Sequence, residues 1–579
     1  MEARSILPGL AWATTYRAAY LPRDVFAGIV LTAILVPAGI GYAEAAGLPG
    51  IVGLYATILP LLAYAVLGPS RILVLGPDSS LLPLVAAAVL PLAGGDDARK
   101  VTLAALLAVI VGVVIVAAGV ARLGFLTDLL SAPVRVGYLN GIAIIVGIGQ
   151  LPKLFGFSVS GDSMVDEARA FVEGVRDGKT VPAALAVGIA SLVLILLIRR
   201  WRPHVPGIFI AVVGSTVISA VLDLQGTAGV TVVGTLPTGL PPFSIPLVSV
   251  DDILALVPAA LGIALVAATD TSVLSRTFAI RRHEEVEPDR ELVALGGANL
   301  ATGLFSGMPV SSSASRTPVA EAAGAQTQLT SVVGALAIAA MLLFVPGLLA
   351  ALPQSVLAAV VISAALTLVD IPFMVRLWRI GSAEFWLSLA SFLGVAFVGV
   401  IQGVFLAVVL SLIAFVRRAW APHDAVLGRA DGVKGYHDLT FYPHARQVPG
   451  LLLYRFDAPL FFANADVFRA RLRERIEAAH QSIRWVVIAA EPITDVDTTA
   501  ASMLDDLVEE LEGGGITLAF AELKDPVRER LRRYGALERV PDDHIYPTVG
   551  TAVSGYLRAT GQTWRDWEES ADERASERP

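Results

Sequence analysis

The chain has 579 residues, of which 55% are hydrophobic and 16% are charged, and its mean hydropathy is +0.69. Soluble globular domains contain about 25% charged residues, so most of this chain requires a non-aqueous solvent. The net charge of −8 falls largely in the C-terminal part, and the absence of cysteine excludes disulfides and thiolate metal sites.

A short N-terminal segment, residues 1–25, precedes the first predicted membrane span. The first apolar stretch is long enough to stay in the bilayer and has no cleavage site, so we expect no signal peptide. Hydropathy, with Gly, Pro and charges as boundaries, predicts a first set of spans at 27–46, 51–67, 78–92, 101–119, 127–149, 180–198 and 206–222.

A second set of seven spans is predicted at 252–275, 290–305, 313–322, 328–346, 354–369, 384–398 and 399–417. In each set the third member is short, follows a proline (Pro77 or Pro309) and opens with serines. Such paired, interrupted segments indicate an inverted-repeat transporter. We therefore predict an α-helical polytopic membrane protein with 14 spans in a seven-plus-seven inverted repeat.

Basic residues gather in the loops after even-numbered spans, as at 199–202 and 276–282. Because loops rich in Lys and Arg stay in the cytoplasm, this pattern places both termini there. We expect a multi-pass protein of the plasma (inner) membrane.

The sequence changes character after the predicted transport domain, 26–418. Alternating strand and helix patterns predict a cytoplasmic α/β domain at 436–560, joined by a linker at 419–435 and followed by a charged tail at 561–579 of a composition typical of disorder. Within this domain "GLLLYRFDAPLFF" predicts a pair of strands.

Asp497, Thr498 and Thr499 stand at a predicted helix N-terminus in the α/β domain. Two interpretations are open. Asp497 is an N-cap with adjacent hydroxyls, or the three residues contact a phosphate or nucleotide at the positive end of the helix dipole.

Ionisable side chains inside membrane spans are costly and are functional candidates by default. The predicted spans contain Glu44, Asp78, Asp270, Arg316 and Glu321. Asp78 opens the third span together with Ser79 and Ser80, and it either caps the helix or holds a coupling cation. Glu44 is interpreted as interfacial, and Glu321 is assigned no role.

The stretch "GMPVSSSASRTPVAEAAG" brings Ser312, Ser313 and Ser315 directly before Arg316. If the repeats are inverted, the N-termini of two half-helices converge here, and their amides and hydroxyls replace the hydration shell of an oxyanion. Arg316 adds a permanent positive charge. The alternative is that the serines cap and pack a helix end while Arg316 snorkels to the interface.

Asp270 interrupts the apolar stretch "GIALVAATDTSVLSR". Desolvation favours the neutral form of a carboxyl group, so Asp270 is expected to carry a proton. A permanent ion pair with Arg316 is the structural alternative.

These stretches resemble the SulP (sulfate permease) family. The resemblance covers about residues 20–560 and rests on "GLPGIVGLYATILPLLAYAVLGPSRILVLGPDSSL", "PVRVGYLNGIAIIVGIGQLPKLFG", "VVGTLPTGLPPFSIP" and "GLFSGMPVSSSASRTPVAEAAGAQTQLT". The C-terminal stretch "ITDVDTTAASML" is similar to the family's STAS domain, which makes phosphorylation of Thr498 a hypothesis.

The resemblance implies a core and a gate domain, an elevator motion, a homodimer, and an anion site at Asp78–Leu81 and Ser313–Arg316. Members of the family carry sulfate, bicarbonate, chloride or dicarboxylates, and they use the region of Asp270 for coupling to protons or sodium. The chain departs from the family pattern at Ala38, at Ala314 and at Asp78. A pocket with fewer aromatic and more hydroxyl groups favours a tetrahedral oxyanion.

We predict secondary active transport of sulfate by proton symport. The predicted anion contacts are Ser79, Ser80, Ser312, Ser313, Ala314, Ser315 and Arg316, and the predicted coupling-ion residues are Asp270 and Asp78. Alternatives are sodium-coupled bicarbonate or dicarboxylate transport, an uncoupled anion channel or exchanger, and a membrane sensor with the STAS domain as its output.

The sequence contains no Walker motif, metal-ligand cluster or nucleophile–base constellation. We therefore expect no enzyme activity, no cofactor, no metal and no nucleic-acid partner. The expected partners are a small inorganic anion, a proton or sodium ion, the lipid bilayer and a second copy of the chain.

Overall fold

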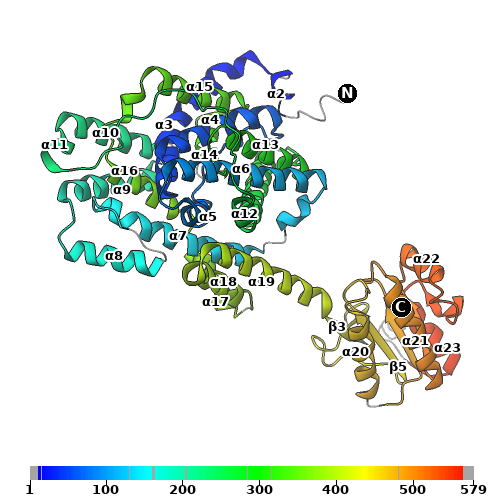
Figure 1. Ribbon diagram of the computed structural model, residues 1–579. Coiled ribbons are helices and arrows are strands. Elements are labelled where there is room, and N and C mark those ends of the chain that lie inside the picture. The colour runs from blue at the N-terminus through cyan, green and yellow to red at the C-terminus, as the bar shows by residue number, and fades with distance from the viewer. Residues whose placement is uncertain are drawn as a thin grey trace, which may run out of the picture. The chain divides into compact units, whose positions relative to one another are not determined.

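The computed structural model of the chain describes residues 9, 11–14, 16–128, 131–159, 164–202, 205–282, 284–313, 316–381, 383–479 and 481–564. Contacts divide the chain into two compact units, 1–412 and 413–579. The first unit is helical, and the second combines a sheet with helices (Figure 1).

The first half of the helical unit contains α2 (Ala11–Thr14), η2 (Ala18–Tyr20), α3 (Leu21–Ala45), α4 (Gly50–Leu67), α5 (Leu82–Ala93), α6 (Asp97–Val120), η3 (Gly124–Asp128), α7 (Ala132–Leu154), α8 (Met164–Arg176), α9 (Pro182–Trp201), α10 (Gly207–Val221) and α11 (Leu224–Ala228). The second half contains α12 (Val250–Arg282), α13 (Pro288–Leu304), α14 (Arg316–Ala322), α15 (Leu329–Phe344), η4 (Pro346–Leu349), α16 (Gln354–Ala365), α17 (Ile371–Ile380), α18 (Ala383–Leu393), the π-helical η5 (Gly394–Val398) and α19 (Val400–Trp420).

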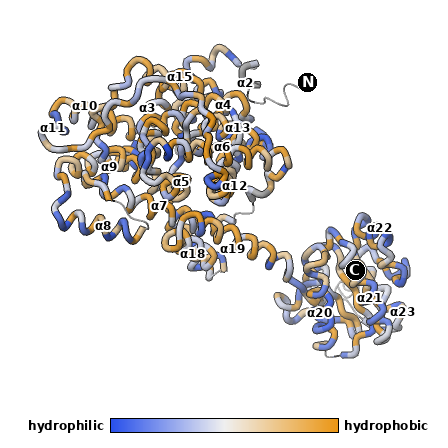
Figure 2. The backbone as a smooth tube through the Cα atoms, viewed as in Figure 1, coloured by the Kyte–Doolittle hydropathy of each residue, from blue (hydrophilic) through white to orange (hydrophobic). Residues whose placement is uncertain are grey.

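Each of the 14 predicted spans overlaps one of these helices. Seven helices of the described chain are long and apolar enough to cross a membrane, and the others are shorter, so the number of spans stays a prediction. The amphipathic helices α8 and α17 and the short helices α2 and α11 were not predicted. In α8 and α17, charged residues on one side hide the apolar side from a hydropathy average. Figure 2 shows the apolar character of the helical unit.

The helices of the two halves pack into two groups. Helices α3 to α6 pack with α12 to α15, and α7, α9 and α10 pack with α16 and, through α7, with α18. Each group therefore mixes both halves of the sequence, as expected for the core and the gate of an inverted repeat.

Two short strands lie inside the first group. β1 (Leu75–Gly76) precedes α5, β2 (Ser311–Ser312) precedes α14, and the two pair antiparallel with Leu75 opposite Ser312 and Gly76 opposite Ser311. The short third members of the two repeats therefore meet through their backbones in opposite directions.

The C-terminal unit contains a six-stranded sheet in the order β4-β3-β5-β6-β7-β8. β3 pairs antiparallel with β4 and β5, and β5 to β8 are parallel. The bounds are β3 (Asp424–Arg429), β4 (Tyr436–Asp438), β5 (Leu451–Phe456), α20 (Ala465–Glu477), β6 (Trp485–Ala489), α21 (Thr498–Gly513), β7 (Thr517–Ala521), α22 (Asp525–Arg533), η6 (Asp542–His544), β8 (Ile545–Tyr546) and α23 (Val549–Thr560).

Alternation along the strands sends side chains to two separate cores. Leu452 and Tyr454 join the core with α20, α21 and α22, whereas Leu451 and Leu453 join the core with α23. The sheet is therefore covered by three helices on one face and by α23 on the other.

Two sequence predictions for this unit differ from the structure. The range expected as a linker, 419–435, contains β3, which lies between β4 and β5 in the sheet and whose short apolar pattern does not reveal this. "GLLLYRFDAPLFF" forms only one strand, β5, and an isolated bridge from Leu460 to Val496, because Pro459 interrupts the second run. Residues 565–579 of the predicted tail lie outside the described residues.

Helices α3 and α4 approach closely at Gly39 and Gly53. A Cβ atom at Gly53 would lie 1.8 Å from the carbonyl oxygen of Gly39, so the two helices have to separate in Gly53→Ala. We expect this substitution to cost about 1–3 kcal/mol and to lower the thermal midpoint of the purified protein. The control is Gly214→Ala in α10, where nothing lies within 4 Å. Equal midpoints for the two variants would contradict the close packing.

Candidate functional site

The β1–β2 pair is held by hydrogen bonds from the surrounding helices. Ser313 N donates to Val74 O (3.1 Å), and Val74 N donates to Thr317 Oγ1 (3.2 Å). On α13, Asn299 Nδ2 donates to Val310 O (3.0 Å) and Asn299 Oδ1 accepts from Val310 N (2.9 Å). Non-helical backbone at membrane depth requires such partners, and here they fix the segment that carries Arg316.

Arg316 is only 1% exposed, so the interpretation that it snorkels to the interface is wrong. Its Nη2 donates to Pro77 O and lies 3.8 Å from Asp78 Oδ1. In the described part of the chain, Arg316 Nε and Nη1 have no hydrogen-bond partner. Nη2 of this buried guanidinium thus contacts protein groups, whereas the N–H donors of Nε and Nη1 have no partner among the described residues.

Ser80 lies between two carboxylates. Ser80 Oγ is 3.0 Å from Asp78 Oδ2 and 2.9 Å from Asp270 Oδ2, and Ser80 N donates to Asp78 Oδ2 (3.2 Å). Asp78 therefore stabilises the turn before α5, and it is also the ion-pair partner of Arg316. The predicted alternative of an Asp270–Arg316 ion pair is wrong for the residues that the structure describes.

The other predicted anion contacts gather around the same point. Ser79, Ser312 and Ser313 are all buried, and Ser313 Oγ accepts from Arg316 N (3.4 Å). Ser312 Oγ has no hydrogen-bond partner within the described ranges. Ala314 and Ser315 lie outside the described residues.

Tyr42 on α3 was missed by the sequence analysis. It is 3% exposed and lies near Ser79, Asp78 and Arg316, so it brings an aromatic ring to this region. Its position five residues after Pro37, in the same span, was the available signal.

Glu44 and Glu321 have protein contacts of their own. Lys153 Nζ donates to the carbonyl oxygen of Glu44 (2.9 Å), which attaches the end of α7 to α3. Glu321 lies 3.5 Å from Arg281 and 3.9 Å from Arg282. Within the described chain neither residue forms an ion pair or hydrogen bond with Arg316, and Glu321 connects α14 to the end of α12.

Glu291 on α13, a buried carboxylate away from Arg316, was also missed. It is 2% exposed and accepts hydrogen bonds from Tyr64 Oη (2.6 Å) and from Ser70 Oγ. Gln328 Nε2 donates to Ser70 O (2.9 Å) and to Leu73 O (3.0 Å). Together these bonds fix the loop that leads into β1. Glu291 is the second residue of the predicted span 290–305. A charged residue at the end of a span is expected at the membrane surface, so it was not considered as a buried group.

Comparison with known proteins agrees with this architecture. The profile of the Sulfate permease family matches residues 21–391, and that of the STAS domain matches residues 442–552. The chain belongs to the sulfate permease family.

Relatives in this family share much of the sequence. The chain is 42% identical to "Probable sulfate transporter MT1781" of Mycobacterium tuberculosis (strain CDC 1551 / Oshkosh) over 96% of this chain and 99% of that protein. It is 33% identical to "Probable sulfate transporter 4.2" of Arabidopsis thaliana over 95% of this chain and 83% of that protein. The chain is thus a polytopic member of a transporter family, which argues against an enzyme.

Solved structures share the fold. The murine Solute Carrier 26 family member A9 anion transporter in its inward-facing state has a TM-score of 0.86 at 23% identity, covering 96% of this chain and 94% of that one. The transmembrane domain of the cyanobacterial bicarbonate transporter BicA has a TM-score of 0.58 at 21% identity, covering 69% of this chain and 98% of that one. These similarities show the helical transporter fold.

In the STAS domain, Asp497 is the N-cap of α21. Its Oδ1 accepts from Ala500 N (2.8 Å) and its Oδ2 accepts from Phe462 N (2.8 Å). Both carboxylate oxygens therefore have backbone partners, whereas Thr498 and Thr499 are exposed. A phosphate contact or phosphorylation at Thr498 stays a prediction.

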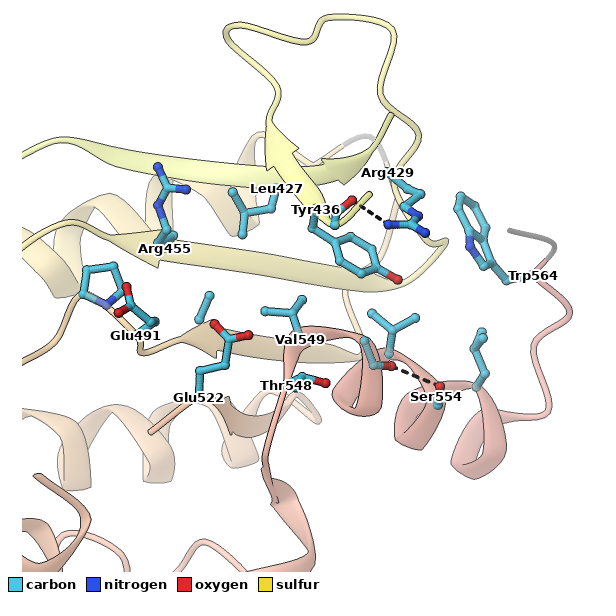
Figure 3. A pocket seen from close by; sticks show the side chains of 16 residues that line it. Leu427, Arg429, Tyr436, Arg455, Glu491, Glu522, Thr548, Val549, Ser554 and Trp564 are labelled. Carbon is cyan, nitrogen blue, oxygen red and sulfur yellow. Dashed lines mark hydrogen bonds between the residues drawn. The ribbon is translucent and has the colours of Figure 1, made fainter. Parts of the chain in front are cut away.

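A cavity of about 660 Å³ lies on the α23 face of the same sheet (Figure 3). Arg455 and Glu491 lie at one end, and Arg429, Tyr436 and Trp564 lie at the other. Arg429 donates to Gly435 O (2.8 Å) and lies over the Tyr436 ring, so its guanidinium already has partners within the domain. The lining does not include Asp497, Thr498 or Thr499, which separates the cavity from the predicted regulatory residues.

Substituting Glu291 by Leu is expected to leave the buried Tyr64 hydroxyl and the half-buried Ser70 hydroxyl without their acceptor. Each such loss costs about 1–3 kcal/mol, so the thermal midpoint should fall by several degrees. The control is Glu291→Leu combined with Tyr64→Phe, which removes one orphaned hydroxyl and should recover part of the loss. A Glu291→Leu protein as stable as wild type would contradict the importance of this cluster.

Proposed function

We propose that the chain carries sulfate across the membrane together with a proton. The anion binds at Arg316, between the segment with Ser79 and Ser80 and the segment from Ser312 to Ser315. Asp270 carries the proton, and Asp78 is the counter-charge of Arg316. The observation that supports this proposal best is the Ser80 hydroxyl lying between two carboxylates, 3.0 and 2.9 Å away.

The anion is favoured by the chemistry around Arg316. Its Nε and Nη1 atoms, together with Ser312 Oγ, are buried donors without hydrogen-bond partners in the described chain. A guanidinium presents its donors in a planar fork that suits the oxygens of an oxyanion. Because all these groups are buried, an anion that accepts from them is bound away from water.

The role proposed for a proton is supported by the number of hydrogens and charges around Ser80. A hydroxyl has one hydrogen, so Ser80 can donate to only one of the two carboxylates. The second short contact becomes a hydrogen bond when one carboxyl group carries a proton. When Asp78 and Asp270 are both ionised, their two negative charges exceed the single positive charge of Arg316. An arriving dianion then meets a net negative charge. Protonation of Asp270 removes this repulsion, so proton and anion each favour the binding of the other.

Sodium is the second candidate for the coupling ion. The oxygens of Asp78, Ser80 and Asp270 are the type of ligand that hard cations prefer. Bicarbonate or a dicarboxylate would use the same guanidinium, so these anions are the alternative substrates.

We further propose that the protein works as a homodimer in the plasma (inner) membrane, with both termini in the cytoplasm. The orientation is supported by the basic residues at 199–202 and 276–282. The domain limits proposed are a transport domain at 26–418 and a STAS domain that begins with β3, upstream of the predicted residue 436.

Asp270→Asn is expected to abolish stimulation of sulfate uptake by an inward proton gradient, because the amide cannot exchange a proton. The measurement is radiolabelled sulfate uptake into proteoliposomes with and without the gradient. Asp251→Asn is the matched control, since Asp251 lies exposed at the start of the same helix α12. Gradient-stimulated uptake in Asp270→Asn would contradict the proposal that Asp270 carries the coupled proton. Stimulation by sodium alone would favour the sodium alternative.

Arg316→Ala is expected to raise the KM for sulfate by roughly 10- to 100-fold, since charge-assisted hydrogen bonds contribute about 1.5–3 kcal/mol. Gly76→Ala should raise the KM severalfold, because the new Cβ would lie 2.8 Å from Arg316 Nη1 and would displace the guanidinium. Gly76 has φ +158°, which residues with a side chain rarely adopt, so Gly76→Ala is also expected to lower the thermal midpoint, and its KM is measured on protein that has been checked to be folded. An unchanged KM in both variants would contradict an anion site at Arg316.

A further inference from the structure

The amphipathic helix α17 is fixed on one side by the helices around it. Leu377 is 5% exposed, and Met374 Sδ accepts from Ser388 Oγ of α18 (2.9 Å). Asp370, the N-cap, donates its N–H to Asn140 Oδ1 on α7 (2.9 Å) and accepts from Phe373 N (3.0 Å). The helix therefore presents its remaining surface in a defined orientation. Figure 1 shows α17 beside α18.

One exposed arc of α17 is apolar. Ile371, Val375 and Trp378 follow the i, i+4, i+7 spacing of one helix face and are 61, 41 and 61% exposed. Trp378 continues into an aromatic cluster with Phe385 and Trp386 of α18, whose ring centroids lie 4.9 and 6.5 Å from that of Trp378. Trp386 is 63% exposed. Indole rings with this exposure are typical of the boundary between acyl chains and headgroups.

The basic residues of α17 lie on a different arc. At 100° per residue, Arg376 and Arg379 are about 60° apart, and Arg379 lies about 40° from Val375, so the basic arc adjoins the apolar one. Both guanidinium groups are exposed, and no ion pair or hydrogen bond of either one is found within the described ranges. Arg376 lies over the Phe373 ring, 4.9 Å from its centroid.

We infer that α17 and the first turn of α18 form a binding surface for the phosphate headgroups of anionic phospholipids. Arg376 and Arg379 contact the phosphate, and Trp378 and Trp386 lie at the level of the glycerol backbone. A basic arc beside an apolar arc with tryptophan is the pattern of a helix that lies in the interface. The chain belongs to a polytopic transporter family, so lipid is the surrounding that this exposed arc meets. The inference concerns a separate surface and does not rest on the proposed sulfate symport.

The test uses the purified full-length chain in detergent. Brominated short-chain phosphatidylglycerol and phosphatidylcholine are titrated while tryptophan fluorescence is recorded, and Trp378→Phe/Trp386→Phe identifies the part of the quenching that arises at this surface. We expect phosphatidylglycerol to bind more tightly. Arg376→Gln/Arg379→Gln should weaken phosphatidylglycerol roughly 10- to 30-fold, since each basic residue near an anionic surface contributes about 1 kcal/mol. Binding of phosphatidylcholine should not change.

The matched control, Arg199→Gln/Arg200→Gln, removes the same two charges from the end of α9. Retained phosphatidylglycerol binding in this control supports the inference, and equal weakening in both variants would overturn it in favour of general surface charge. Wild-type binding in Arg376→Gln/Arg379→Gln would also overturn it. A loss of dimers without a change in lipid binding, measured by mass photometry, would mean that a second copy of the chain covers this face.

Discussion

The burial of the Arg316 guanidinium is the constraint on which the centre of this protein depends. A cation with 1% exposure is costly unless carbonyl and carboxylate groups surround it. Pro77 O and Asp78 supply these groups from the other half of the chain, and the β1–β2 pairing brings them within reach. The interrupted segments of both repeats are therefore needed together, because neither one alone provides a partner for the charge.

The same arrangement explains why the polar centre extends outward from Arg316. The loop before β1 cannot form a continuous helix with α5, so its backbone and hydroxyls need partners elsewhere. Glu291, Tyr64 and Gln328 provide them on one side, and Thr317 and Asn299 do so nearer to β1 and β2. Hydrogen bonds therefore hold the segments on both sides of the β1–β2 pair, which fixes the backbone that carries Pro77 and Arg316.

The sequence predicted the helices well because most are long, apolar and bounded by glycine or proline. It also showed that the two segments with Ser79, Ser80 and Arg316 interrupt apolar stretches, since charges and hydroxyls are rare in such surroundings. It did not identify the partners. Glu291 and Tyr42 meet residues more than 30 positions away, and pairing over that distance leaves no periodic signal. In the C-terminal unit β3 was missed for the same reason, because it is recognised as a strand mainly by its neighbours in the sheet.

Asp78 and Asp270 share Ser80 but differ in what else they contact. Asp78 lies 3.8 Å from Arg316 and accepts the Ser80 N–H, so its negative charge has a cation and a backbone donor. Asp270 has the Ser80 hydroxyl as its hydrogen-bond partner. Among the described residues, Asp78 has a basic side chain within ion-pair distance and Asp270 has none. Because Asp78 is the counter-charge of Arg316, Asp270 is not needed to neutralise it, and the proposed role of Asp270 as the proton carrier requires this division of roles.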